Sequence, residues 1–319
     1  MAQALLEYAD WLDERELLWP TPPDPVPVKA TPYLEGLPDV RAVTWGAYGT
    51  LLLVSDGRLQ PVVPNRLRME VALERTIEEF NMWHSMSRKP GAPWEYMLHQ
   101  LQNLVDHRKM AGTGHRGEAP EVDLAKVWQK LIERLQQKGY EWDRKRYGAL
   151  DDFSAKVAFF FQSCLQGVRA APHALEALLH VREAGCRQGI IGDGQVFTLV
   201  QLLRGLRGDK PVPPLTKLFS AGCVSLSYQF GVRQPAETLF RACLANLARH
   251  QIASREVLHV ASRLKEELVP AKRLGMKTAL YAGDNRSLEA TAAEINDPHL
   301  RPDRILTDLK QIRQIVREE

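Results

Sequence analysis

Helical and strand-like segments alternate along the second half of this chain, and this alternation constrains its fold more than any other feature. Apolar residues recur at helical spacing in some segments and run without interruption in others. The expected elements are helix 173–185, strand 187–191, helix 196–206, helix 237–250, strand 257–260, helix 267–275 and strand 277–283. Strands that alternate with helices of this length form a parallel sheet with helices on both faces. The sequence therefore predicts an α/β fold with a doubly wound parallel sheet.

A long helical stretch interrupts this pattern between residues 63 and 167. Segments such as 69–86 and 122–140 place apolar residues at helical spacing, and a glycine-containing break lies near Ala111–Gly114. Just before the stretch, Leu52–Leu59 has the pattern of a β-hairpin that turns at an Asp-Gly pair. We expect an all-helical insertion after this hairpin.

The first 38 residues form a separate N-terminal segment. A helix is expected over residues 2–18, and the proline-rich stretch 19–32 then favours an extended tether over a regular helix or a central strand. Such an arm can lie across its own domain or bind a protein partner, including a second copy in a homodimer. The expected division is an arm over 1–38, an α/β core over 39–62 and 168–319, and a helical cap over 63–167.

Composition excludes several classes of protein. With 319 residues, of which 45% are hydrophobic and 25% charged, the chain suits one large or two modest globular domains. Its net charge of +3 arises from basic and acidic residues spread along the chain, so nucleic acid is not expected as a partner. No run of about 18 apolar residues exists, so no membrane partner is expected either. Four widely separated cysteines without a Cys-x-x-Cys pair, and an N-terminus without a signal-type apolar core, indicate reduced thiols and a cytoplasmic protein.

Residues 41–53 combine an apolar strand with the tight turn Gly46-Ala47-Tyr48-Gly49-Thr50. This segment resembles the first motif of the haloacid dehalogenase-like hydrolase superfamily, an apolar strand followed by Asp-x-Asp-Gly-Thr-Leu. In that family the first Asp is the nucleophile, and in the dehalogenase branch the second Asp is commonly Tyr, as at Tyr48. Gly46 stands at the nucleophile position, and glycine offers no side chain for covalent catalysis.

Two further segments resemble the second and third motifs of the family. The hydroxyl residue of the second motif corresponds to Gly192, followed by Asp193, which could cap the next helix or take part in a site. The lysine of the third motif corresponds to Gln234, beside Arg233 in Gly231-Val232-Arg233-Gln234-Pro235. A guanidinium is not interchangeable with an ammonium, so Arg233 is only a partial substitute.

The fourth family motif, which holds magnesium in the phosphatases, corresponds to residues 259–267. Ser262 stands at the principal ligand position and Glu267 at the secondary one. Magnesium needs several oxygen ligands in near-octahedral order. With Gly46 and Ser262 both lacking carboxylates, the resemblance implies a degenerate member with no cofactor, in which Glu267 is only a weak metal candidate.

Three functions follow as hypotheses. The first is a catalytically silent protein that binds a small anion or a partner between cap and core, with Thr50, Asp193, Arg233 and Arg263 as ligand-binding residues. The second is a hydrolase with non-standard groups, in which Asp193, Glu267 or His259 activates water. The third is a structural protein that assembles through its N-terminal arm.

Overall fold

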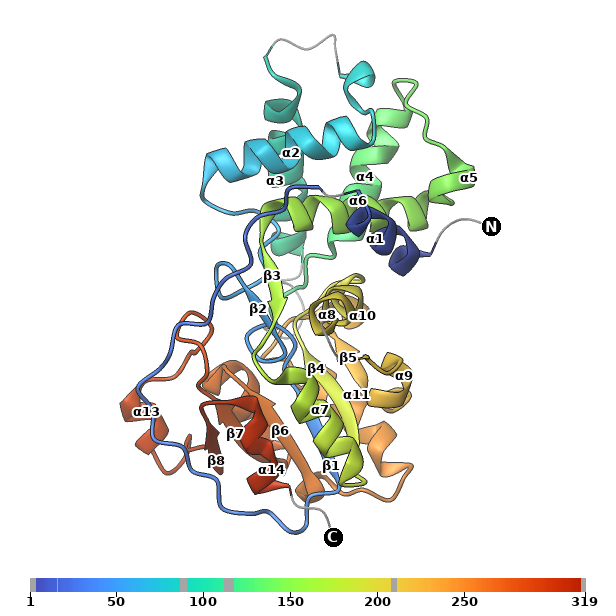
Figure 1. The fold of residues 1–319 in the computed structure, drawn as a ribbon. Coiled ribbons are helices and arrows are strands. Elements are labelled where there is room, and N and C mark those ends of the chain that lie inside the picture. The colour runs from blue at the N-terminus through green and yellow to red at the C-terminus, as the bar shows by residue number, and fades with distance from the viewer. Residues whose placement is uncertain (1–3, 16, 87–90, 112–117, 208–210, 317–319) are drawn as a thin grey trace. The chain divides into compact units, whose positions relative to one another are not determined.

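The computed structural model describes residues 4–15, 17–86, 91–111, 118–207 and 211–316. The chain divides into two compact units, shown with the rest of the fold in Figure 1. The helical unit contains Met1–Thr21, Gln60–Gly167 and Gln195–Val200, and the α/β unit contains Pro22–Leu59, Val168–Gly194 and Gln201–Glu319. The break at Ala111–Gly114 falls largely outside the described residues.

A six-stranded parallel sheet forms the centre of the α/β unit, which confirms the predicted fold class. Its strand order is β5-β4-β1-β6-β7-β8. The strands are β1 (Ala42–Trp45), β4 (Arg187–Gly192), β5 (Val224–Leu226), β6 (Val257–Ala261), β7 (Lys277–Tyr281) and β8 (Arg304–Leu306). Because β1 lies between β4 and β6, the carboxyl ends of these three strands meet at one edge of the sheet.

Helices cover this sheet in two packed groups. The helices of the unit are α7 (Ala174–Glu183), α8 (Thr198–Leu206, shared with the helical unit), α9 (Leu215–Leu218), α10 (Ser227–Phe230), α11 (Glu237–Ala248), α12 (Val269–Arg273), α13 (Ala292–Asn296) and α14 (Ile312–Ile315). Helix α11 packs against α12 and β4, and α7 packs against α14. Phe240 and Leu247 of α11 are fully buried in one core cluster with Ile191 and Val257 of the strands. The described residues of the unit also form short helical turns at Ser254–Glu256, Leu264–Leu268 and Leu309–Gln311.

The predicted hairpin over Leu52–Leu59 is wrong. Strand β2 (Leu52–Val54) pairs in antiparallel fashion with β3 (Val168–Ala170), which lies more than a hundred residues further along the chain. The Asp-Gly turn does form, since Gly57 has a φ of +74° and its N–H donates to the Val54 carbonyl. The chain does not return along β2, because the Arg58 side chain is held by Glu289 and Pro61 follows shortly afterwards.

The helical unit is built around α6 (Leu150–Leu165), whose Phe153, Phe159 and Phe161 are fully buried. The other helices are α1 (Leu5–Asp13), α2 (Arg66–Glu79), α3 (Pro93–Ala111), α4 (Leu124–Gln136) and α5 (Arg144–Tyr147), with a single turn at Trp83–Ser85. Helices α1, α2 and α4 all pack against α6. The predicted first helix is therefore shorter than residues 2–18, and it joins the helical unit through the buried Tyr8 and Leu12.

The proline-rich arm is extended and bonded to its own chain. Asp284 accepts a hydrogen bond from the Val26 N–H at 2.8 Å, and the Asn285 N–H donates to the Val26 carbonyl at 2.7 Å. Further along, Tyr33 forms an antiparallel bridge with Ile305 of β8. Within the described ranges, no helix has both the length and the apolar character needed to cross a membrane.

Candidate functional site

The loop that follows β1 carries the position of the missing nucleophile. A Cβ atom at Gly46 would lie 2.8 Å from Thr50 Oγ1 and 3.1 Å from Glu267 Oε1. Gly49 has a φ of +90°, which favours glycine, and a Cβ there would lie 2.5 Å from Ser262 Oγ. The tight turn of the motif is therefore present, and neighbouring polar side chains occupy the space next to Gly46.

Tyr48 lies in the same loop but is held away from solvent. Its hydroxyl donates to Gln201 Oε1 at 2.5 Å, and the side chain is buried. Tyr48 therefore helps to fix the loop through a hydrogen bond to α8.

At the end of β4, Asp193 forms an ion pair with Arg233. The Arg233 Nε and Nη2 donate to one carboxylate oxygen at 3.0 and 2.9 Å, and the Gln234 N–H donates to the other at 2.8 Å. Asp193 therefore binds the loop of the third motif and does not cap α8. A Cβ at Gly192 would lie 3.2 Å from the Ala47 nitrogen, so this glycine permits a close approach of two backbone segments.

Beyond β6, Arg263 is almost completely buried within a network of charges. Its Nε donates to Glu289 at 3.1 Å, its Nη2 donates to the Gly57 carbonyl at 3.1 Å, and its backbone N–H donates to Glu267 at 3.0 Å. Arg58 extends the network, because it bonds both Glu289 and Glu266. Both arginines predicted to bind a ligand, Arg233 and Arg263, are thus paired with carboxylates.

Among the residues that the structure describes, three buried donors around this loop have no hydrogen-bond partner. They are Thr50 Oγ1, Ser262 Oγ and Gln234 Nε2, and each belongs to a side chain that is at most 4% exposed. Buried polar atoms are nearly always hydrogen-bonded, in part to ordered water, so such a group calls for an explanation.

Glu267 is the carboxyl group closest to the nucleophile position, and it is fully buried. Burial raises its pKa to about 7, while the Arg263 guanidinium and the Arg263 N–H oppose that rise. The group therefore changes charge near neutral pH.

We expect stability to fall as pH rises between about 4.5 and 7, because of Glu267. Its pKa is about 7 in the folded chain against an ordinary value of 4.5, so in this window the folded state binds a proton that the unfolded state has released. The slope should be on the order of 1 kcal/mol per pH unit in the middle of the window. Urea unfolding at several pH values would measure it, and Glu267→Gln should remove it. An identical slope in that variant would contradict the assignment.

His259 lies in the middle of strand β6 and not at the carboxyl end of the sheet. Its Nδ1 lies 2.9 Å from Thr44 Oγ1, and its ring packs edge-on against Phe240. Burial lowers the pKa of His259 to about 3. The imidazole is therefore neutral and enclosed, which does not suit the activation of water.

The residues at this edge do not fit a magnesium ion. Gly46 and Ser262 supply no carboxylate, and Asp193 and Glu267 already accept hydrogen bonds from Arg233 and from the Arg263 N–H. Across the described part of the chain, no group of three or more His, Cys, Asp or Glu side chains is placed to hold a metal ion. Hard cations need several convergent oxygen ligands, whereas Glu267 is the carboxyl group that lies beside Gly46.

Sequence reasoning missed Arg58, Glu266 and Glu289, which complete the charge network. Glu289 is brought to Arg263 by an isolated parallel bridge between the two residues. No motif marks these positions. Only their charge could have pointed to them, at Arg58 next to the Asp-Gly turn and at Glu289 beyond β7.

No family model matches the sequence, and no curated protein matches it either. Solved structures do resemble its fold. That of 2-haloacid dehalogenase from Pseudomonas syringae pv. Tomato DC3000 aligns with a TM-score of 0.52 at 18% identity, covering 86% of this chain and 96% of that chain. The structure of HAD phosphatase from Thermococcus onnurineus aligns with a TM-score of 0.47 at 16% identity, covering 88% of this chain and 99% of that chain. Together with the parallel sheet order, the first of these alignments shows that this chain has the haloacid dehalogenase-like hydrolase fold.

Proposed function

We propose that this chain binds a small oxyanion at the carboxyl ends of β1, β4 and β6 and does not hydrolyse it. The observation that supports binding is the set of three buried, unpartnered donors, namely Thr50 Oγ1, Ser262 Oγ and Gln234 Nε2. An unsatisfied buried donor costs about 1–3 kcal/mol, so a bound oxyanion that accepts from these groups gains that free energy.

The cysteines bear on where the protein acts. All four are free thiols, which suits a reducing compartment such as the cytoplasm.

The lack of turnover follows from the side chains next to the loop. Gly46 has no nucleophile, and the carboxylate of Asp193 is occupied by Arg233 and the Gln234 N–H. Without an attacking group, only the weak catalysis that comes from binding alone is left.

Charge makes this binding dependent on pH. Arg58 and Arg263 pair with the carboxyl groups of Glu266, Glu267 and Glu289, and Arg233 pairs separately with Asp193. When Glu267 is protonated, three positive charges meet three negative ones, whereas its ionisation adds a net negative charge. An anion should therefore bind more tightly below pH 7 than above it.

A hydrolase that uses Glu267 as a general base is the second candidate. Its pKa of about 7 suits proton transfer at neutral pH, and it lies beside the Thr50 hydroxyl near Gly46. Assembly through the N-terminal arm has less support, since Val26 and Tyr33 of the arm are bonded within the chain.

Turnover separates these candidates. We expect the purified protein to release no product from p-nitrophenyl phosphate or 2-chloropropionate, with or without magnesium, because position 46 offers no nucleophile. Hydrolysis that follows the protein through purification and disappears in Glu267→Gln would favour the second candidate and reject the first.

Binding is tested with inorganic phosphate. We expect a saturable rise in melting temperature with a dissociation constant near about 1 mM, stronger at pH 6 than at pH 8, as for a ligand that binds only the folded state. Thr50→Val and Ser262→Ala should each weaken it, because each removes one donor. Thr76→Val is the matched control, since Thr76 is buried in the helical unit and donates to the Ala72 carbonyl. A shift that is absent, or equal in all variants, would reject oxyanion binding.

A further inference from the structure

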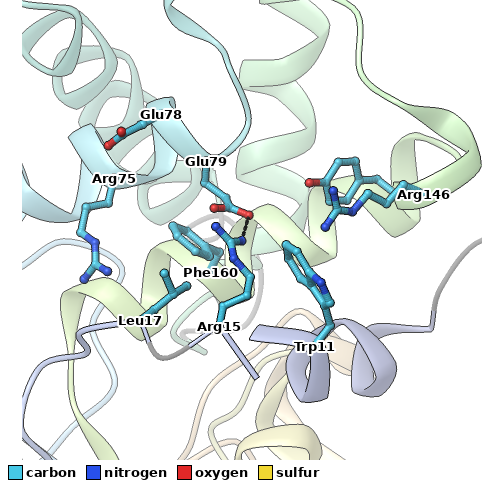
Figure 2. A pocket seen from close by; sticks show the side chains of 9 residues that line it. Trp11, Arg15, Leu17, Arg75, Glu78, Glu79, Arg146 and Phe160 are labelled. Carbon is cyan, nitrogen blue, oxygen red and sulfur yellow. Dashed lines mark hydrogen bonds and ion pairs between the residues drawn. The ribbon is translucent and has the colours of Figure 1, made fainter. Parts of the chain in front are cut away.

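The helical unit contains a pocket that lies outside the site described above. It has a volume of about 520 Å³ and is bounded by α1, α2, α5 and α6, together with the segment that follows α1. Figure 2 shows its lining side chains, which are Trp11, Arg15, Leu17, Arg75, Glu78, Glu79, Arg146, Tyr147 and Phe160. Pockets of about 300–1,000 Å³ hold small organic molecules.

Within the described part of the chain, two arginines of this pocket have no carboxylate partner. Arg15 is neutralised by Glu79 at 2.6 Å, as the dashed line in Figure 2 marks. Arg146 lies over the Trp11 ring at 4.0 Å, and Arg75 donates to the Leu18 carbonyl and lies 5.5 Å from the Trp19 ring. Among the described residues, neither Arg75 nor Arg146 forms an ion pair with an acid. Glu78, the other acid in the lining, is exposed and carries one negative charge. The two positive charges of Arg75 and Arg146 therefore outnumber it.

Apolar and aromatic side chains form the rest of the wall. Phe160 is buried, and both Phe160 and Tyr147 pack edge-on against Phe80. Figure 2 shows Phe160 and Leu17 between the Arg75 end and the Arg146 end of the pocket. The lining thus combines apolar side chains and the Arg15–Glu79 ion pair with the guanidinium groups of Arg75 and Arg146 at its two ends.

We propose that this pocket binds a small aromatic carboxylate. The ring would pack against Phe160 and Leu17, and the carboxylate would accept charge-assisted hydrogen bonds from Arg146 or Arg75. An inorganic anion would leave the apolar wall uncovered, and a neutral aromatic compound would leave both guanidinium groups without an acid. A ligand with both features satisfies the whole lining.

The test uses the full chain and three probes. Phenylacetate has both features, phenylacetamide lacks the charge, and acetate lacks the ring. In calorimetric or NMR titrations we expect saturable binding of phenylacetate, and binding of the other two that is at least about tenfold weaker, since loss of one charge-assisted hydrogen bond alone has about that effect. Failure of phenylacetate to saturate, or equal binding of phenylacetamide, would overturn the proposal.

Variants locate the site. Arg146→Gln and Arg75→Gln should each raise the dissociation constant of phenylacetate by about tenfold. Arg144→Gln is the matched control, because Arg144 lies on the same short helix over Trp142 and does not line the pocket. Thr50→Val should also leave phenylacetate binding unchanged, which separates this pocket from the strand-end site. Wild-type affinity in both Arg75→Gln and Arg146→Gln would show that the probe binds elsewhere.

Discussion

Gly46→Asp is expected to destabilise the folded protein by about 2–4 kcal/mol and to produce no hydrolase activity. The new Cβ would lie 2.8 Å from Thr50 Oγ1, which forces one of the two side chains to move. The new carboxylate would also stand beside Glu267, which is fully buried. Two acids that share a buried site cannot both ionise without a large cost, so one of the pair should stay protonated, and Gln234 supplies no cation to support the introduced nucleophile.

Chemical denaturation of three variants separates the steric effect of a side chain at position 46 from the effect of a second buried acid. Gly46→Ala measures the steric effect alone and should cost about 1–3 kcal/mol. Gly46→Asp combined with Glu267→Gln removes the second acid, so it should be more stable than Gly46→Asp alone. A fully stable Gly46→Asp variant with phosphatase turnover would show that the loop readily accepts the family nucleophile.

Arg263→Met should destabilise the protein by about 3–5 kcal/mol, the effect of breaking a buried ion pair. Arg263 is 3% exposed, and its loss leaves Glu267 without its nearest cation and the Gly57 carbonyl without a donor. Because the Arg263 guanidinium lowers the pKa of Glu267, the variant should also move the pH window of Glu267 upward.

Denaturant unfolding at pH 5 and pH 8 measures both effects. Arg233→Met is the matched control, since the Arg233 side chain is 34% exposed and pairs with Asp193 near the surface. It should cost about 1 kcal/mol or less, as exposed ion pairs usually do. An equal loss of unfolding free energy in Arg263→Met and Arg233→Met would mean that burial does not make the Arg263 ion pairs more important for stability.

The sequence predicted the sheet and the strand ends well, because both depend on local patterns. Apolar runs identified β1, β4 and β6, and the turn Gly46–Thr50 follows β1 as expected. The side-chain network could not be predicted in the same way. Arg58 and Glu289 lie 231 residues apart and meet only when β1, β6 and the segment beyond β7 are packed together.

The incorrect hairpin has a similar cause. The Asp-Gly pair forms the local turn that its residue types favour, but the partner of β2 is Val168–Ala170, beyond the whole helical stretch. Local turn chemistry specifies the bend and not the strand that follows it. The pairing of Arg233 with Asp193 was missed because the charge of a loop arginine gives no indication of its partner.

The bridge between Tyr33 and Ile305 bears on how the sheet meets other chains. Strand β8 is an edge strand, and unpaired edge strands readily add strands from neighbouring molecules. The Tyr33 N–H and carbonyl occupy the backbone groups of Ile305 that an incoming strand would use. The opposite edge, β5, is only three residues long. The N-terminal arm therefore protects this sheet against edge-to-edge aggregation.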